Sequence, residues 1–295
     1  MLSTATKMRI ARTLYVILHA VRGPFGGRDE VRVFRRGVQW NLDLREGIDL
    51  TIFALGAFEW DTLRALETLV RSGATVLDVG ANIGAHTLHL ARLVGERGRV
   101  IAFEPTDFAT SKLRANLRAN PDLETRVEVH QTFLVAKAGA PIDAAVASSW
   151  PVDGAAVDNT QMGSRAMNVS GARAMTIDCV IAAAGDPDVQ LIKMDVDGHE
   201  LDVLEGAQIL LERRRPIIVM ELAPYAFHPP EKFDRMVNLL ARANYAFRPL
   251  GSLRDLPADP ASLRSRIPEG SSVNVVALPS PDKAKANHDR TQRAR

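Results

Sequence analysis

The sequence has little of several features that mark particular classes of protein. Its 295 residues contain one cysteine, Cys179, which excludes a disulfide framework and a cysteine-rich zinc site. A single thiol suits a reducing compartment, and we expect a cytoplasmic protein. No apolar run is long enough to span a bilayer, since the longest one near the N-terminus covers only residues 14–18. No small-residue cleavage site follows that run, so a secretory signal is not expected.

A strong net charge is also missing, and what charge there is lies at the two ends. The formal net charge is +2, of which residues 1–28 carry +5 and residues 281–295 carry +3, which leaves −6 for residues 29–280. A mildly acidic body argues against a nucleic-acid groove, and we expect no nucleic-acid partner. The polar tail, residues 281–295, is predicted to be disordered.

The basic N-terminal extension, residues 1–28, has the pattern of an amphipathic helix. Its apolar residues recur at helical spacing, at Ile10, Leu14, Ile17, Leu18 and Val21. A helix of this kind can lie on a membrane surface, which would give residues 1–23 a membrane contact. We favour the alternative, a helix that packs on the folded domain.

What the chain does contain is a regular alternation of strand and helix patterns. Residues 29–74 form a lead-in, with a hairpin at 31–44 and a helix at 59–71. Residues 75–280 then form one domain, with predicted strands at 75–79, 99–105, 126–135, 190–196 and 216–222, helices at about 83–94, 107–119, 199–212 and 231–243, and an antiparallel pair at 245–251 and 272–279. This order predicts an α/β fold with a doubly wound, mostly parallel sheet, whose ligands bind beyond the carboxyl ends of the strands. The irregular stretch 137–173 is long enough to be functional or disordered.

The ends of the first two strands predict the cofactor. The first strand runs into VLDVGANIGAHTL at 76–88, in which Asp78 precedes Gly80 and Gly84 with the spacing G-x-x-x-G. The G-x-G-x-x-G turn of an NAD(P)-dependent oxidoreductase is missing, and Asp78 would repel a pyrophosphate but attract an ammonium group. The second strand ends in Glu104-Pro105, where a carboxylate can accept both hydroxyls of a ribose. An aminoacyl group near Asp78 and a ribose near Glu104 describe S-adenosylmethionine (SAM).

With these residues in place, the chain resembles the FkbM family of class I SAM-dependent methyltransferases. The blocks that carry the resemblance occur in order, as GAFEWDTLRAL at 56–66, DVGANIGAHTL at 78–88, FEP at 103–105, TIDCVI at 176–181, IKMDVDGHELDVLEGA at 192–207 and IIVMEL at 217–222. The family's usual aromatic residue after the second glycine is replaced here by Ala85-His86. The resemblance implies a Rossmann-like sheet of seven strands with an antiparallel last strand, and methyl transfer to a hydroxyl of a glycan or a secondary metabolite.

The resemblance also implies which residues hold SAM. The first loop, with Asp78, Gly80, Asn82 and Gly84, would hold the methionine part. Glu104 and Pro105 would lie at the ribose, and residues 131–133, with Thr132 at their centre, would lie near the adenine. Asp195 would lie near the methyl group and the acceptor. Glu59 is a further candidate for the amino-acid end of SAM, although it could equally be an acid at a helix N-terminus.

The segment after the fourth core strand supplies the candidates for catalysis. An alcohol is a poor nucleophile at neutral pH, so a base that removes its proton should help. Asp195, Asp197 and His199 are candidates for that base or for acceptor contacts, with His199 as a base oriented by an acid. Asp197 and Glu200 could instead cap the next helix. Two aspartates and a histidine within five residues could also hold a divalent cation, but nothing in the sequence demands one, and we expect no metal.

Several other residues carry weaker expectations. Lys193 lies in a buried strand and needs a carboxylate partner, such as Glu221. Glu221 and His228 are expected to face the acceptor, whereas His86 and His89 are expected to be surface or packed residues. In the irregular stretch, three polar side chains could bind acceptor hydroxyls, namely Asn159, Gln161 and Ser164.

The sequence therefore predicts a SAM-dependent methyltransferase that acts on a hydroxyl of a sugar-like or secondary-metabolite acceptor. N-methylation on the same fold and a non-catalytic SAM-binding scaffold remain as alternatives.

Overall fold

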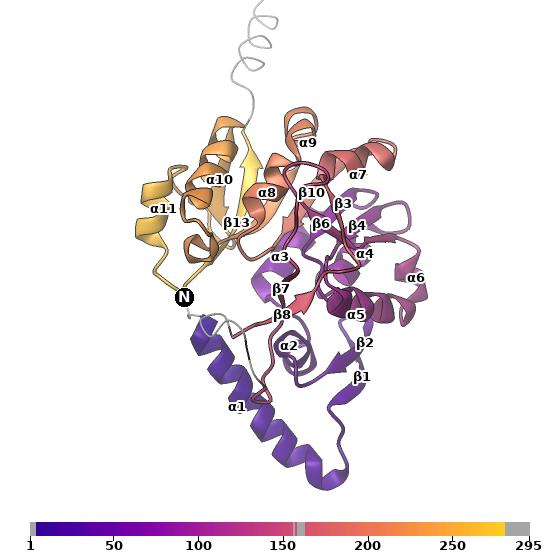
Figure 1. The fold of residues 1–295 in the computed structure, drawn as a ribbon. Helices are drawn as coiled ribbons and strands as arrows, with labels where there is room; N and C mark the ends of the chain where they lie inside the picture. The colour runs from indigo at the N-terminus through magenta and orange to yellow at the C-terminus, as the bar shows by residue number, and fades with distance from the viewer. Residues whose placement is uncertain (1–3, 156, 158–162, 281–295) are drawn as a thin grey trace, which may run out of the picture.

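A sheet runs through the centre of the molecule (Figure 1). It has seven strands in the order β12-β13-β11-β10-β3-β4-β5. The computed structural model describes residues 4–155, 157 and 163–280, so the predicted tail 281–295 lies outside it. β13 pairs antiparallel with both of its neighbours, and the remaining pairs in the sheet are parallel, which confirms the predicted fold class. The strands are β3 (Thr75–Val79), β4 (Arg99–Phe103), β5 (Val127–His130), β10 (Val189–Met194), β11 (Ile217–Leu222), β12 (Tyr245–Pro249) and β13 (Val273–Pro279).

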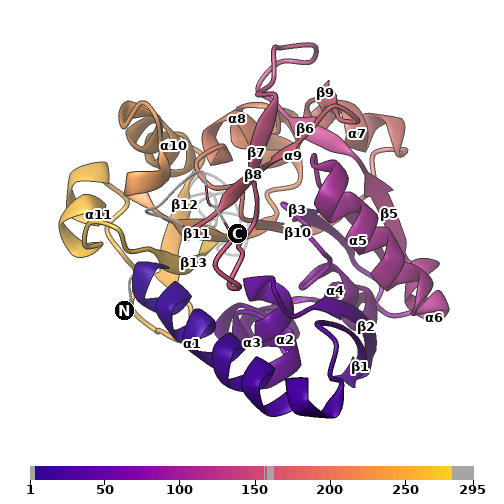
Figure 2. The same ribbon diagram turned by 60° about the horizontal axis from the view of Figure 1, so that its bottom comes forward.

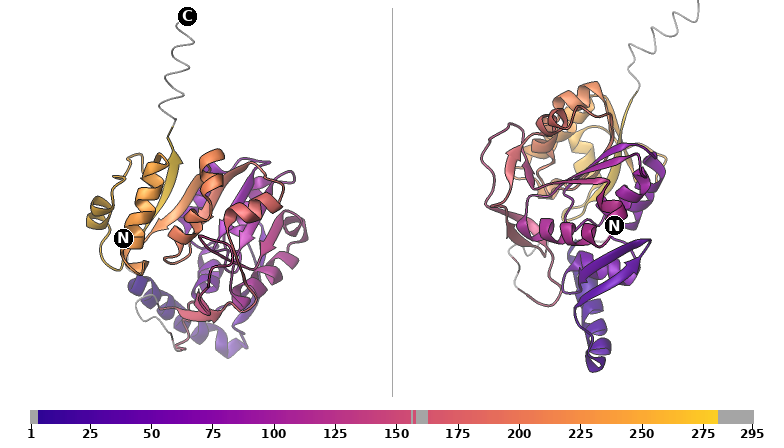
Figure 3. Two further views of the ribbon diagram at one scale, coloured as in Figure 1. Left: turned by 45° about the horizontal axis from the view of Figure 1, so that its top comes forward. Right: turned by 90° about the vertical axis from the view of Figure 1, so that its right-hand side faces the viewer.

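Helices cover both faces of this sheet, as Figures 2 and 3 show from other directions. Successive strand residues point to opposite faces: Leu77 and Val79 join one hydrophobic core with α7 to α10, whereas Val76 joins a second core with α3 to α5. The helices are α1 (Thr4–Arg22), α2 (Gly47–Leu55), α3 (Trp60–Leu69), α4 (Thr87–Val94), α5 (Asp107–Arg118), α6 (Pro121–Glu124), α7 (Ile177–Ala183), α8 (Glu200–Glu205), α9 (Gln208–Arg213), α10 (Glu231–Arg242) and α11 (Pro260–Arg266), with short 3-10 turns η1 (Gly23–Phe25) and η2 (Pro224–Ala226).

The N-terminal segment lies beside the carboxyl ends of the strands. The predicted hairpin is present as β1 (Glu30–Arg35) and β2 (Val38–Asp43), and α1 and α2 lie next to it (Figure 3). The inner face of α1 packs against a small core of Leu44, Leu50 and Val152 through Met8, Ala11, Leu14, Tyr15 and Leu18. The predicted packing of this helix on the domain is therefore observed.

Several predicted boundaries are wrong, and the errors coincide with contacts between residues that are distant in the sequence. The single strand expected at 126–135 is divided at Gln131 into β5 and β6 (Thr132–Leu134), and β6 leaves the main sheet to pair with β9 (Arg173–Met175). The helix expected at 199–212 is interrupted at Gly206, whose position would bring a Cβ within 2.3 Å of the Val135 backbone oxygen. The irregular stretch 137–173 contains an antiparallel hairpin, β7 (Ala145–Ser149) and β8 (Arg165–Asn168).

Candidate active site

A cavity of about 720 Å³ opens beyond the carboxyl ends of β3, β4 and β10, where the sequence places the ligand. This size is ordinary for a small-molecule site. Most of the predicted cofactor and catalytic residues line it, namely Glu59, Gly80, Asn82, Glu104, Pro105, Thr132, Asp195, Asp197 and His199. Residues that are far apart in the sequence are thus brought to one cavity by the parallel strands.

The two glycines of the first loop are required by its geometry. Gly80 has a φ of +75°, and a Cβ there would lie 1.9 Å from the backbone oxygen of Asp195. Gly84 has a φ of +92°, and its Cβ would lie 2.5 Å from Leu88 and 2.8 Å from Leu113. Gly80 therefore lets the end of β3 approach the end of β10, and Gly84 lets the loop pack onto α4 and α5. Gly84 itself is behind the cavity wall and shapes the loop from there.

Glu104 is buried at the end of β4 and is held by the loops on either side. Its Oε1 accepts hydrogen bonds from Thr106 N at 3.0 Å and Thr106 Oγ1 at 2.6 Å, and its Oε2 accepts one from Asn82 N at 3.0 Å. Burial raises the pKa of this carboxyl, although these hydrogen bonds oppose the shift. Since each carboxylate oxygen has two lone pairs, Oε2 keeps the capacity to accept one more donor from the cavity.

These features fit SAM. Glu104 has a free acceptor site for a ribose hydroxyl, and the left-handed glycine loop leaves room for a ligand beside Gly80. Phe103, Phe133 and Leu134 supply an apolar wall suited to the adenine, beside Thr132.

Asp78 lies behind the wall of this cavity. Its side chain is fully buried, its Oδ2 accepts a hydrogen bond from Thr87 Oγ1 at 2.6 Å, and its Oδ1 lies 3.6 Å from Lys193 Nζ. Lys193 also donates to the Gly80 backbone oxygen at 3.2 Å and lies 4.0 Å from Asp195. Burial disfavours the ammonium, but the carboxylates of Asp78, Asp195 and Glu59 outweigh it and raise the pKa of Lys193. The expected carboxylate partner of Lys193 is therefore present, but it is Asp78, with Asp195 next, and not the suggested Glu221, which accepts a hydrogen bond from Ser272.

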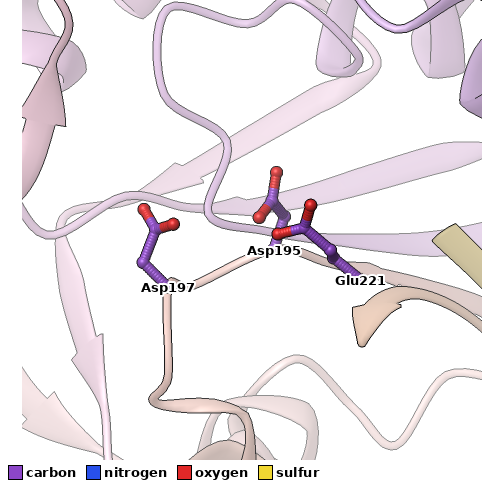
Figure 4. Close-up of side chains that lie close together, drawn as sticks. All are labelled: Asp195, Asp197 and Glu221. Carbon is purple, nitrogen blue, oxygen red and sulfur yellow. The ribbon is translucent and has the colours of Figure 1, made fainter. Parts of the chain in front are cut away.

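Three carboxyl groups meet at the ends of β10 and β11. Asp195, Asp197 and Glu221 each place a carboxylate oxygen within 4.8 Å of the other two, and Figure 4 shows them pointing to the same side of the strand ends. Burial and the neighbouring Asp195 raise the pKa of Asp197 well above its usual value and raise the pKa of Glu221 to about 8. This acidic cluster is therefore partly protonated at neutral pH unless a cation is present.

Glu200 has a structural task in the same loop. Its carboxylate accepts hydrogen bonds from the backbone N–H groups of Val196 at 3.3 Å and Gly198 at 3.0 Å. It therefore holds the turn that carries Asp197, whereas the expected capping of α8 by Asp197 or Glu200 is not observed, because His199 is the N-cap residue and no side chain caps this helix. Asp197 itself adopts a left-handed φ of 48° and directs its carboxyl group to the cavity.

His199 lies at the start of α8, on the cavity side. Its Nε2 is 3.7 Å from Asp143 Oδ2, and its ring meets Phe133 edge-on at a centroid distance of 5.2 Å. Burial lowers the pKa of His199 from its usual value, although Asp143 and Asp202 oppose the shift. The imidazole is therefore neutral at pH 7 and able to accept a proton.

Glu59 joins the cavity from the turn between α2 and α3. It has a left-handed φ of 47°, accepts a hydrogen bond from Thr62 Oγ1 at 3.2 Å and lies 3.9 Å from His86 Nε2. Burial, followed by the charge of Asp195, raises the pKa of Glu59. Glu59 is thus both the N-cap residue of α3 and part of the cavity wall, although its carboxylate makes no capping hydrogen bond to the α3 backbone.

Comparison with known proteins identifies the family. The model of the methyltransferase FkbM domain matches residues 78–247, which is more than half of the chain. The chain belongs to the FkbM methyltransferase family. For this domain, the expected class of SAM-dependent methyltransferase, with SAM as cofactor, is confirmed.

Solved structures similar to this FkbM-family chain include three methyltransferases. The methyltransferase FkbM from Methylobacillus flagellatus KT is 20% identical with a TM-score of 0.46, and the alignment covers 75% of this chain and 48% of that one. The chain thus spans about half the length of that relative. A putative rRNA-methylase from Clostridium thermocellum is 15% identical with a TM-score of 0.45, over 77% and 97% of the two chains. A SAM-dependent methyltransferase from Aquifex aeolicus is 18% identical with a TM-score of 0.40, over 78% and 93%. No curated protein matches the chain.

The cavity of this FkbM-family protein includes residues that sequence reasoning missed. His86, expected only to be packed or exposed, is buried and lines the cavity, and its Nε2 has no hydrogen-bond partner. Ser148, on β7, is not part of the cavity wall, but its hydroxyl lies 2.9 Å from Thr106 Oγ1 beside Glu104. The sequence analysis also did not predict that α1 and α2 contribute to the cavity wall. The apolar spacing of α1 was the one sequence feature that pointed to a buried face on this helix. The expected wall residues Glu221 and His228 are present.

Three polar residues of the irregular stretch have different outcomes. Asn159 and Gln161 lie outside the described residues. Ser164 is buried, with 1% of its surface exposed, and is not part of the cavity wall.

The acidic cluster could hold a hard divalent cation, because carboxylate oxygens are the ligands that Mg²⁺ prefers. The sequence suggested Asp195, Asp197 and His199 as a possible set of metal ligands. In the structure the third residue of the cluster is Glu221 and not His199.

Among the described residues, no helix has the length and apolar character needed to cross a bilayer.

The raised pKa of Glu221 in the acidic cluster leads us to predict how the free energy of unfolding depends on pH. Glu221 is protonated in the folded protein up to about pH 8, whereas its usual pKa of 4.5 ionises it when unfolded. Its contribution to the free energy of unfolding is therefore present below pH 4.5 and is lost as the pH rises toward 8, by at most about 1.4 kcal/mol per pH unit. We expect Glu221→Gln to become progressively more stable than the wild type between pH 5 and 8, measured by urea unfolding with a chelator present. Glu269→Gln, at an exposed site, is the control, and parallel pH profiles for the wild type and Glu221→Gln would contradict the prediction.

Proposed function

We propose that this protein transfers the methyl group of SAM to a hydroxyl group of a sugar-like or secondary-metabolite acceptor. The observation that carries the proposal is the position of His199 and Asp195 in the same cavity as the Gly80 loop and Glu104. When bound, SAM supplies an electrophilic methyl group, and the protein supplies position and a base.

Different residues of the cavity are assigned to different parts of SAM. Glu104 holds the ribose, with Pro105 fixing the turn beside it, and Thr132 lies against the adenine. Glu59 and Asn82 lie on the methionine side, where the Gly80 backbone approaches the ligand. Asp78 acts from behind this loop, since it holds Lys193, and Lys193 in turn binds the Gly80 backbone oxygen and neutralises Asp195.

At the reacting end, His199 is the proposed base and Asp143 orients its ring. The neutral imidazole removes the hydroxyl proton as the acceptor oxygen attacks. Asp195 and Asp197 accept hydrogen bonds from the acceptor and hold its hydroxyl toward the methyl group.

N-methylation is a second candidate, because the acidic cluster would attract an ammonium group. The same carboxylates would raise the pKa of that amine and deplete the neutral nucleophile, which favours the hydroxyl acceptor. The test is turnover with labelled SAM on acceptor pairs that differ only in a hydroxyl or an amino group at the same position. Methylation of the hydroxyl member supports the proposal, whereas methylation of the amine alone contradicts it.

Glu104→Gln tests the cofactor site. We expect SAM affinity to fall by about 1.5–3 kcal/mol, the scale of a hydrogen bond to a charged group, or roughly 10- to 150-fold in Kd. Glu46→Gln is a matched control, since Glu46 is also buried and hydrogen-bonded but does not line the cavity. Calorimetric titration measures both, and unchanged affinity in Glu104→Gln would remove this residue from the ribose site.

His199→Asn tests the base. We expect kcat to fall by about 100-fold or more while SAM affinity is kept, because general-base catalysis is worth at least that much. The wild type should lose kcat on acidification below pH 6.5 as His199 is protonated, and the variant should lack this limb of the profile. His130→Asn, outside the cavity, is the control, and a normal rate in His199→Asn would overturn the role.

A further inference from the structure

Part of the cavity wall, which we call the apolar annex, is formed by α1, α2 and the turn after α2. It comprises Met8, Ala11, Leu14, Ile48, Leu55 and Phe58. These residues precede β3 in the chain, whereas the residues assigned to SAM, apart from Glu59 in the turn after α2, follow β3, β4, β5 and β10. The annex and the SAM loops are therefore separate walls of one continuous cavity.

The annex offers almost no polar contact to a ligand. Among the described residues of α1, α2 and the turn after α2, the polar side chains on the wall are Lys7, Thr51 and Glu59, and Glu59 is the one assigned to the methionine side of SAM. The Thr51 hydroxyl already donates to the Gly47 backbone oxygen at 2.7 Å, and Lys7 is exposed at the rim. A sugar ring placed here would lose its hydration without gaining hydrogen bonds, whereas an apolar group would gain from burial.

The mouth of the annex is apolar as well. Ile10 and Leu55 both line the cavity, yet they are 55% and 60% exposed. Ile17 and Val21 follow Ile10 on the same stripe of α1, at positions i+7 and i+11, and are 55% and 60% exposed. An apolar surface thus runs from inside the cavity, over its rim and along the outside of α1.

From this geometry, and resting on the proposed function, we propose that the annex binds an apolar part of the methyl acceptor. The acceptor is then amphipathic: its hydroxyl-bearing part lies at His199 and Asp195, and an apolar chain or ring system lies between α1 and α2 and leaves over Ile10 and Leu55. The continuity of the annex with the reacting end of the cavity selects the acceptor as the occupant.

The test uses the full chain and alkyl β-glucosides of increasing chain length, below the concentrations at which they form micelles, with SAM present. Calorimetry should show affinity that rises about fourfold for each methylene that enters the annex, the effect of burying one such group. A dependence on chain length supports the proposal, and equal or absent binding of methyl, hexyl and octyl glucosides overturns it.

Two matched pairs of variants locate the binding. Leu55→Gln should weaken octyl glucoside binding about fivefold, while Leu253→Gln, at another exposed leucine outside the cavity, should not. Ala11→Phe should fill the annex and shorten the longest chain that gains affinity, while Ala20→Phe, on the outer face of α1, should not. Equal effects within each pair would overturn the proposal, as would a dimer of the free protein that Leu55→Gln alone dissociates.

SAM binding distinguishes this proposal from the proposed function. All four variants should bind SAM as the wild type does, because their residues lie outside the SAM loops. Chain-length dependence in a protein that does not bind SAM would contradict the proposed function and leave an apolar binding site that is not that of a methyl acceptor.

Discussion

Gly80→Ala should lower the free energy of unfolding by about 3 kcal/mol or more, because it combines a left-handed φ with overpacking. The added Cβ would lie 1.9 Å from the Asp195 backbone oxygen, and backbone atoms cannot rotate away as a flexible side chain can. The ends of β3 and β10 would have to separate. The change should therefore also abolish SAM binding, since both ends shape the cavity. Urea unfolding and calorimetric titration measure the two effects.

Gly73→Ala is the matched control for this prediction. Gly73 has a φ of +84°, similar to that of Gly80, but a Cβ there would meet no atom within 4 Å. The control therefore carries only the cost of the left-handed backbone, about 1 kcal/mol. If the two variants lose the same stability, close approach of the two strand ends is not what requires a glycine at position 80.

Lys193→Met should cost about 3–5 kcal/mol of unfolding free energy, because it leaves the carboxylate of Asp78 buried without its cation. Methionine keeps much of the volume of the lysine side chain, so the loss reports charge more than packing. The Gly80 backbone oxygen loses its donor as well, which should loosen the first loop. Urea unfolding at pH 7 measures the effect.

Two further variants test whether the loss of stability in Lys193→Met comes from the lost charge. Asp78→Asn added to Lys193→Met should restore much of the stability, because asparagine can still accept the hydrogen bond from Thr87. Lys232→Met removes an ion pair of 3.0 Å with Asp202, but this pair is partly exposed, and such pairs contribute about 1 kcal/mol or less. If Lys193→Met is as mild as Lys232→Met, or if Asp78→Asn gives no rescue, Lys193 is not the counter-ion of a buried carboxylate.

The sheet could be predicted from sequence because its signals are local. Apolar runs bounded by Gly, Pro and acids mark β3, β10 and β11, and the glycines after β3 mark the turn to α4. The boundaries that were missed depend on distant contacts: Gly206 interrupts α8 and α9 because Val135 lies against it, and β6 leaves the sheet because β9 offers it a partner. No pattern within those segments encodes such contacts.

The part of the site that lies at the strand ends could be predicted from the sequence. Glu104 and Asp195 lie at the ends of predicted strands and His199 follows one of them, and parallel strands bring their ends together. The direction of each side chain was harder to predict, since Asp78 and Glu104 both belong to strand ends but Asp78 faces inward to Lys193. The acidic cluster, the buried His86 and the apolar annex depend on how β11, α1 and α2 pack against the loops, which local sequence does not specify.

Calorimetric titration of the full chain with SAM, with NAD as the comparison, tests the central claim most directly. A SAM-dependent methyltransferase with Glu104 at the ribose should bind SAM at one site per chain and give no signal with NAD. A folded sample that binds NAD, or that binds neither ligand, would contradict the account.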